Sequence, residues 1–191
     1  MGSSQSIQIP KSKMEDYLKW TYLNEKEILT LYEKFESCFY TNRDPNFILE
    51  QRIHVKEIFE KIPQIKYNIF CDRIIIVFSS KQDGCFSFED LLDFFSVMSD
   101  KCPVQVKARW AYKLFDFNNQ KEINPDDIRV LIKRLTSSNS DQKLSDDDVE
   151  NILQVIMSKM DVEDNNSIGC HEFEHVLKNL SHFESAFTCE P

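Results

Sequence analysis

Apolar residues recur at intervals of three and four along most of the chain, and polar segments separate the stripes that they form. This spacing places apolar side chains on one face of an α-helix, where they can be buried together. Ser145, followed three residues later by Asp148, predicts the start of one such helix. The stripes predict helices over 28–39, 55–59, 91–98, 110–115, 128–135 and 149–160, and one that ends at Phe78. The chain is therefore predicted to be all-α.

Two twelve-residue segments between these helices share a pattern of oxygen-bearing side chains. The third loop, 116–127 (DFNNQKEINPDD), and the fourth loop, 161–172 (DVEDNNSIGCHE), carry them at positions 1, 3, 5 and 12, with Ile at position 8. An EF-hand loop has this spacing, because a chain folded around a hard cation offers an oxygen at every second residue and a carboxylate at the end. Binding of calcium or magnesium is the first functional hypothesis.

Four units of this kind can be aligned along the chain. Position 8, where paired loops exchange a short strand contact, and position 13, at the start of the next helix, are apolar in every unit. These positions are Ile53, Phe86, Ile123 and Ile168, and Ile58, Leu91, Ile128 and Phe173. We predict a calmodulin-like fold with two lobes: an N-terminal segment (1–20), an N-terminal EF-hand pair (21–101), a C-terminal pair (102–180) and a C-terminal extension (181–191).

The N-terminal pair is expected to be free of metal. The first unit has no series of acidic ligands. The second loop, 79–90, has Ser79 at position 1 and Lys81 at position 3, where an ammonium group would repel a cation. Asp83 and Asp90 remain but cannot complete six or seven oxygen ligands.

In the third loop the expected metal ligands include an aspartate at the last position. That Asp is one methylene shorter than the usual Glu, tends to give one oxygen instead of two, and so favours six-coordinate Mg²⁺ over Ca²⁺. Lys121 replaces the glycine of position 6, where the backbone is left-handed. The ligands are Asp116, Asn118, Gln120, the carbonyl of Glu122, and Asp127. We expect Mg²⁺ or Ca²⁺ here, bound weakly or not at all.

The fourth loop has the better ligand set, and we expect it to bind Ca²⁺. Asn166 stands at position 6, and asparagine tolerates a positive φ better than most residues. The ligands are Asp161, Glu163, Asn165, the carbonyl of Ser167, and Glu172, which can bind through both oxygens.

A rival zinc site lies within the same segment. Residues 171–175 read His-Glu-Phe-Glu-His, which on a helix places two imidazoles on one face and a glutamate beside a bound water, as in zinc hydrolases. His171 would then stand at position 11 of the fourth loop, and Glu172 would already be a calcium ligand. A zinc-dependent hydrolase is therefore a remote alternative, and no other catalytic motif stands out.

Charge argues against nucleic acid as a partner. The net charge of −9 and the lack of a long Lys/Arg run do not suit phosphate binding, whereas acidity suits cations and basic helical peptides. The six cysteines are scattered and suit reduced intracellular thiols. We expect a cytoplasmic protein, with the nucleus as an alternative location.

The first six residues, Met-Gly-Ser-Ser-Gln-Ser, fit the N-myristoylation pattern, with Gly2 as the acceptor. One acyl chain gives only marginal, reversible membrane binding. Peripheral membrane association through myristate is therefore expected.

Several runs of sequence resemble one family. The segments 68–80 (NIFCDRIIIVFSS), 86–97 (FSFEDLLDFFSV) and 111–117 (AYKLFDF) are similar to those of the calcium and integrin-binding (calmyrin) proteins, as is the ending 182–187 (HFESAF). The resemblance spans nearly the full length and is closest to the founding member. It implies a non-enzymatic adaptor with metal in the third and fourth loops and an acylated N-terminus.

The resemblance also implies a partner. Members of this family hold amphipathic helices, such as integrin α-subunit cytoplasmic tails, in a groove of the C-terminal lobe, and others serve kinases or mechanotransduction channels. Helical spacing suggests that the groove is lined by Trp110, Leu114, Leu131, Leu135, Ile152, Ile156, Met157, Phe173 and Leu177. Each of these could instead be buried core. Because Asn118, Gln120 and Lys121 depart from the acidic residues and glycine of the family, a metal-insensitive structural subunit remains the main alternative.

Overall fold

A computed structural model describes residues 9–40, 43–137, 144–180 and 182–191, apart from the side chain of Gln64. The predicted acceptor Gly2 lies outside these residues. The chain divides into two compact units, one formed by residues up to Cys102 together with Thr188–Pro191, and the other by Pro103–Phe187.

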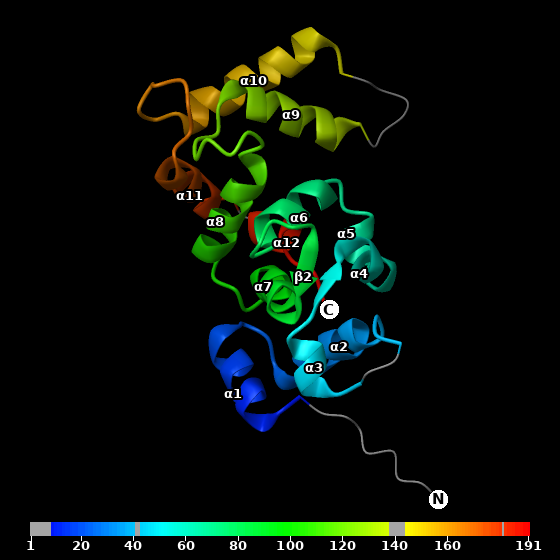
Figure 1. The fold of residues 1–191 in the computed structure, drawn as a ribbon. Coiled ribbons are helices and arrows are strands. Elements are labelled where there is room, and N and C mark those ends of the chain that lie inside the picture. Colours follow the sequence, from blue (N-terminus) through cyan, green and yellow to red (C-terminus); the bar gives the residue numbers. More distant parts are fainter. Residues whose placement is uncertain (1–8, 41–42, 138–143, 181) are drawn as a thin grey trace, which may run out of the picture. The chain divides into compact units, whose positions relative to one another are not determined.

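The first unit contains two helix-loop-helix repeats and a helix that precedes them. Its elements are α1 (Lys11–Trp20), α2 (Glu25–Glu36), α3 (Pro45–Leu49), β1 (Arg52–His54), α4 (Val55–Lys61), α5 (Pro63–Lys66), α6 (Cys71–Phe78), β2 (Cys85–Ser87) and α7 (Phe88–Met98) (Figure 1). The predicted stripes coincide with α2, α4, α6 and α7. The short helix α1 was not predicted, because only Met14 and Tyr17 of its ten residues are buried.

Aromatic rings fill the core of the first unit around Phe88 at the start of α7. The ring centroids of Tyr17, Tyr32 and Phe35 lie 5.6, 5.6 and 5.5 Å from that of Phe88. Edge-on and tilted contacts of this kind stabilise a core beyond the area that they bury. Tyr17 also donates a hydrogen bond to Glu89 Oε1 at 2.8 Å, which ties α1 to α7.

The second unit contains the remaining two repeats. Its elements are α8 (Val104–Phe115), α9 (Pro125–Thr136), α10 (Asp146–Met160), α11 (Cys170–Lys178) and α12 (Phe183–Ala186) (Figure 1). The predicted start of α10 is confirmed, since Ser145 and Asp148 form a capping box. The third loop ends in a second capping box between Asn124 and Asp127. The side chains of Asn124 and Asp127 therefore both end the third loop and cap the start of α9.

The predicted pairing of loops is confirmed in both units. Ile53 pairs with Phe86 in an antiparallel two-stranded sheet, and Ile123 forms an antiparallel bridge with Ile168. All four residues at position 13 are buried: Ile58, Leu91, Ile128 and Phe173. The all-α fold class is confirmed. Among the described residues, no helix has the length and apolar character needed to cross a membrane.

Candidate metal centre

Both candidate loops in the second unit have the same left-handed backbone turns. At position 6, φ is +66° for Lys121 and +62° for Asn166, as predicted. At position 4, φ is +57° for Asn119 and +53° for Asp164, and neither of these turns was predicted. Asn and Asp tolerate this conformation, whereas a lysine is strained in it. Lys121 is therefore the least suitable residue of the four.

Replacing Lys121 with Gly is expected to raise the free energy of unfolding by about 0.5–1 kcal/mol, because glycine adopts a positive φ without a steric penalty. Urea denaturation of the metal-free protein measures this change. Lys121→Ala is the matched control, since it removes the same charge but keeps the Cβ. Equal stabilisation by Ala and Gly would contradict the role of backbone strain.

In the third loop, the carboxylate of Asp116 at position 1 organises the turn. Its Oδ1 accepts the N–H of Gln120 at 2.9 Å, and its Oδ2 accepts the N–H of Lys121 at 2.8 Å. Asp116 is buried, so these hydrogen bonds compensate part of the loss of water around its charge. The loop thus keeps its first predicted ligand in place through its own backbone.

Asp127 closes the third loop from position 12. Its Oδ1 accepts the N–H of Phe117 at 3.0 Å, and its Oδ2 accepts the N–H of Asn124 at 3.1 Å and Nδ2 of Asn118 at 3.2 Å. Burial raises the pKa of Asp127 above its ordinary value, although the backbone hydrogen bonds act in the opposite direction. A cation in the loop would favour the ionised form of this buried carboxylate.

The fourth loop repeats this arrangement at its first position. Oδ1 of Asp161 accepts the N–H of Asn165 at 3.1 Å, and its Oδ2 accepts the N–H of Asn166 at 2.8 Å. These are the same two positions, 5 and 6, that Asp116 contacts in the third loop. Asn165 Oδ1 in turn accepts the N–H of Ser167 at 2.9 Å.

Glu172 closes the fourth loop with both of its oxygens. Its Oε1 accepts the N–H groups of Val162 and Glu163 at 2.7 and 2.9 Å, and its Oε2 accepts the N–H of Gly169 at 2.7 Å. The hydrogen bond from Gly169, followed by those from Glu163 and Val162, lowers the pKa of Glu172 despite some burial. Glu172 is thus held as a carboxylate at the end of the loop.

The other predicted ligands are more loosely arranged. Asn118 Oδ1 accepts the N–H of Gln120 at 3.0 Å, while Glu122 and Glu163 are exposed. Oε2 of Glu163 lies 3.5 Å from Nδ2 of Asn165. Across the described parts of the chain, no three His, Cys, Asp or Glu side chains converge on one point. The donors are all oxygens, which fits a hard cation, but amide and carbonyl oxygens must complete its shell.

A buried tyrosine connects the two loops. The hydroxyl of Tyr112 in α8 lies 2.8 Å from the carbonyl oxygen of Lys121 and 3.1 Å from that of Ile168. Burial raises the pKa of Tyr112 to about 12, so the hydroxyl stays protonated as a donor. Tyr112 lies outside the twelve-residue pattern and was not predicted. Its one signal is a tyrosine one helical turn before the first predicted ligand of the third loop.

The alternative zinc site is not assembled. His171 and His175 are exposed on α11, and the carboxylate of Glu172 is engaged by three N–H groups of the fourth loop. Glu174 forms an ion pair with Nε of Arg109 at 2.7 Å and accepts a hydrogen bond from Cys170 Sγ at 3.4 Å. This segment therefore serves the loop and the packing of α11 against α8.

The candidate groove residues differ in exposure. Leu114, Phe173 and Leu177 are buried, so they are core residues and do not line a groove. Leu135 in α9 and Ile152 in α10 are 54% and 37% exposed. The remaining four are half-buried: Trp110, Leu131, Ile156 and Met157. Only part of the predicted lining is thus accessible to a partner.

Comparison with known proteins places these loops in context. The EF-hand domain pair family matches residues 105–180, which include both loops. Proteins called calcium and integrin-binding family member 2 match nearly the whole chain. The protein of Drosophila melanogaster is 30% identical over 185 residues and 95% of each chain, and that of Rattus norvegicus is 28% identical over 188 residues and 98% of each chain. The human protein is 27% identical over 188 residues. The expected closeness to the founding member of the family has no support here, because all of these relatives are called family member 2.

Proposed function

Because the chain belongs to the calcium and integrin-binding family of EF-hand proteins, we propose that it is a metal-binding adaptor for amphipathic helices of target proteins. Ca²⁺ would bind in the fourth loop through Asp161, Glu163, Asn165, Ser167 and Glu172. The third loop would take Mg²⁺ or Ca²⁺ more weakly. The relatives are named for binding calcium and integrin, which supports a regulator and not an enzyme, and makes an integrin cytoplasmic tail the first target to test.

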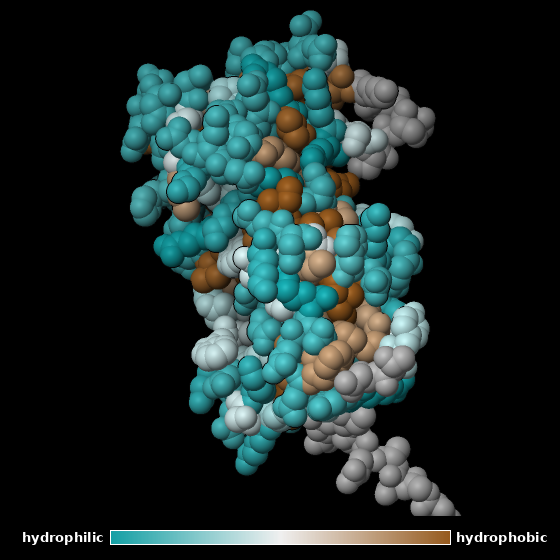
Figure 2. Space-filling model, viewed as in Figure 1, coloured by the Kyte–Doolittle hydropathy of each residue, from teal (hydrophilic) through white to brown (hydrophobic). Residues whose placement is uncertain are grey.

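The observation that carries this proposal is an apolar surface on α9 and α10. Leu135 on α9 and Ile152 and Val155 on α10 are each between 37% and 54% exposed. Figure 2 shows hydrophobic surface atoms over these two helices, among hydrophilic ones. An amphipathic helix can cover such a surface with its own apolar face. The net charge of −9 favours a partner whose polar face is basic.

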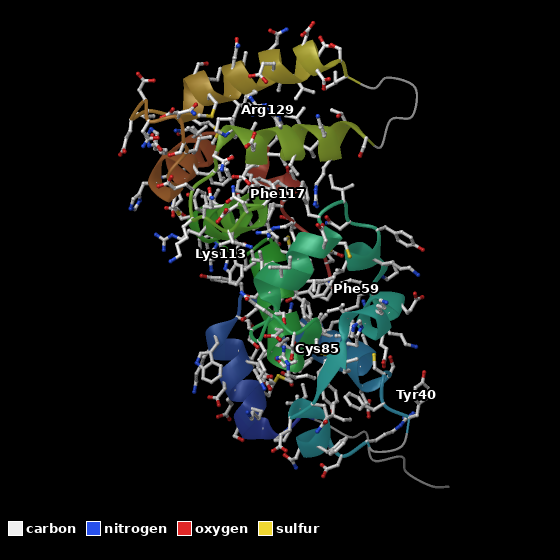
Figure 3. All side chains as sticks on the ribbon, turned by 45° about the horizontal axis from the view of Figure 1, so that its top comes forward. Tyr40, Phe59, Cys85, Lys113, Phe117 and Arg129 are labelled. Atoms are coloured by element: carbon white, nitrogen blue, oxygen red, sulfur yellow. The ribbon has the colours of Figure 1, made fainter. Side chains whose placement is uncertain are left out.

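An ion pair holds the two helices of this surface together. Nε and Nη2 of Arg129 in α9, the residue labelled in Figure 3, lie 3.1 Å from Oε2 and Oε1 of Glu150 in α10, and its Nη1 lies 2.7 Å from Asp126 Oδ1. A bidentate arginine fixes geometry more than it adds stability at a surface. The apolar surface is thus presented by two helices that this ion pair joins side by side.

We expect Leu135→Glu to weaken binding of a basic amphipathic peptide from an integrin α-subunit tail about tenfold or more, because a carboxylate replaces an apolar contact. Isothermal titration of the full chain in Ca²⁺, in Mg²⁺ and in EDTA measures this. Leu18→Glu is the matched control, since Leu18 is 40% exposed in the other unit. Loss of binding with both variants would contradict the proposed surface.

The same titration separates the alternatives. An adaptor controlled by metal binds the peptide more tightly in Ca²⁺ than in EDTA. Equal affinity in all three conditions favours a metal-insensitive structural subunit of one partner complex. Peptidase activity that is lost on chelation and restored by Zn²⁺ would favour the hydrolase and exclude the adaptor as the whole function.

Peripheral membrane association through Gly2 is a further part of the proposal. The pattern over residues 1–6 supports it, and a single acyl chain would make the contact reversible. After co-expression with N-myristoyltransferase, the wild-type chain is expected to sediment with liposomes and Gly2→Ala to stay in the supernatant. Intact mass gives the state of acylation, and equal sedimentation of both chains would contradict the role of Gly2.

A further inference from the structure

The second loop, 79–90, has the backbone of a metal-binding loop although it lacks acidic residues at positions 1 and 3. Its φ is +52° at Gln82, position 4, and +73° at Gly84, position 6. The third and fourth loops have positive φ at the same two positions. A loop that no longer needed to surround a cation would not have to keep two left-handed turns.

The end of the second loop is also closed in the same way. Asp90 at position 12 accepts the N–H of Ser80 with Oδ1 at 3.2 Å and the N–H of Ser87 with Oδ2 at 3.0 Å. These donors stand at positions 2 and 9, as do the N–H donors to Asp127 in the third loop. Only 5% of the Asp90 side chain is exposed, so its charge is largely removed from water.

A positive charge from the first repeat satisfies the carboxylates of this loop. Arg52 in β1 contacts Asp83 through Nε at 3.1 Å and Nη2 at 2.8 Å. Its Nη1 lies 3.0 Å from Oδ2 of Asp90. The guanidinium presents fixed donors that match two oxygens of one carboxylate. These hydrogen bonds, with the one from Cys85, hold the pKa of Asp83 well below its ordinary value.

Arg52 also contacts the uncharged oxygens of the loop. Nη2 lies 2.6 Å from the carbonyl oxygen of Cys85, which Figure 3 labels, and 3.2 Å from Oγ of Ser79. Nη1 lies 3.0 Å from Oγ of Ser80. Together with Asp83 and Asp90, these contacts engage positions 1, 5, 7 and 12, which supply ligands to the cation in an EF-hand. The side chain of Arg52 is 15% exposed.

We propose that the second loop is a cation site whose cation is the guanidinium of Arg52, and that removal of this side chain uncovers a site for a divalent cation. A cation on the same chain is always present, so the loop is closed at any calcium concentration. Without it, Asp83 and the largely buried Asp90 would face each other uncompensated, which is costly. Lys81, expected to repel a cation, is exposed and does not take part in these contacts.

Strand pairing explains how Arg52 reaches the loop. The register of β1 and β2 places Arg52 opposite Ser87, one residue before the pair of Ile53 with Phe86. Arg52 is therefore position 7 of the first repeat, where a metal-binding loop offers its carbonyl inward. The first repeat has no series of acidic ligands of its own, and its Arg52 closes the second loop. This inference does not rest on the proposed function, because it concerns the other unit.

Hydrogen–deuterium exchange of the full chain, followed by mass spectrometry over residues 79–90, tests the proposal. In the wild type, exchange of this segment is expected to be equal in EDTA and in millimolar Ca²⁺. Arg52→Met keeps the length of the side chain but removes the charge, and should speed exchange in EDTA about tenfold or more. Millimolar Ca²⁺ should slow it again, and Asp83→Asn added to Arg52→Met should abolish that effect.

The matched control is Lys66→Met, which removes the exposed ion pair of Lys66 with Glu60, 2.8 Å long, from the same unit. It should leave exchange of 79–90 unchanged. Unchanged exchange in Arg52→Met, or a loosened loop that Ca²⁺ does not slow, would overturn the proposal. If Arg52→Met does not fold, the wild type still decides, because protection of 79–90 by Ca²⁺ would show that Arg52 does not occupy the site.

Discussion

Replacing Glu172 with Gln is expected to lower the affinity of the fourth loop for Ca²⁺ about 100-fold, or about 2.7 kcal/mol. A glutamate at position 12 can give a cation two oxygens and one negative charge, whereas glutamine gives one neutral oxygen. The carboxylate also accepts three backbone N–H groups, from Val162, Glu163 and Gly169. The metal-free protein is therefore expected to lose about 1–2 kcal/mol of stability as well.

Isothermal titration with Ca²⁺ measures the first effect, and urea denaturation in EDTA measures the second. Asp147→Asn serves as the control, because it removes one negative charge from an exposed position of α10 outside the loop. An equal loss of affinity in both variants would mean that overall charge, and not coordination by Glu172, governs binding.

Replacing Asp127 with Glu is expected to raise the affinity of the third loop for Ca²⁺ about tenfold and to reverse a preference for Mg²⁺. The added methylene lets the carboxylate bring a second oxygen to the cation, which suits the larger coordination number of calcium. Asp127 is only 2% exposed, so the extra volume is expected to cost about 1 kcal/mol of stability in the metal-free protein.

Titration with each metal in the Glu172→Gln background isolates the third loop. Asp126→Glu is the matched control, since it adds the same methylene at the neighbouring exposed aspartate, which pairs with Arg129. Unchanged relative affinities for Ca²⁺ and Mg²⁺ in Asp127→Glu would show that the length of this side chain does not set the choice of metal.

Much of the fold could be predicted from the sequence because its signals are local. The apolar stripes give the helices, and the recurrence of Ile53, Phe86, Ile123 and Ile168 gives the pairing of loops. The helix α1 escaped prediction because two buried residues make too short a stripe. Helical spacing identified the inward faces of α8 and α11, but it could not distinguish a groove from the core that buries Phe173 and Leu177.

The candidate site was predictable only within its twelve-residue windows. Spacing identified the positions of Asp116, Asp127, Asp161 and Glu172, because each ligand position depends on its neighbours in the chain. Tyr112 and Arg52 lie outside those windows and reach the loops through tertiary packing and strand pairing. Contacts between residues that are far apart in the chain produce no repeating pattern in a single sequence.

The shared hydroxyl of Tyr112 has a consequence for how the protein responds to calcium. One hydrogen serves two carbonyl groups, one in each loop, so a cation that tightens the fourth loop also changes the free energy of the third. Such coupling is reciprocal. The Glu172→Gln titration is therefore expected to show altered binding in the intact third loop too, and an unchanged third loop would contradict this. The two loops then behave as one coupled unit, whose occupancy does not follow that of two independent sites.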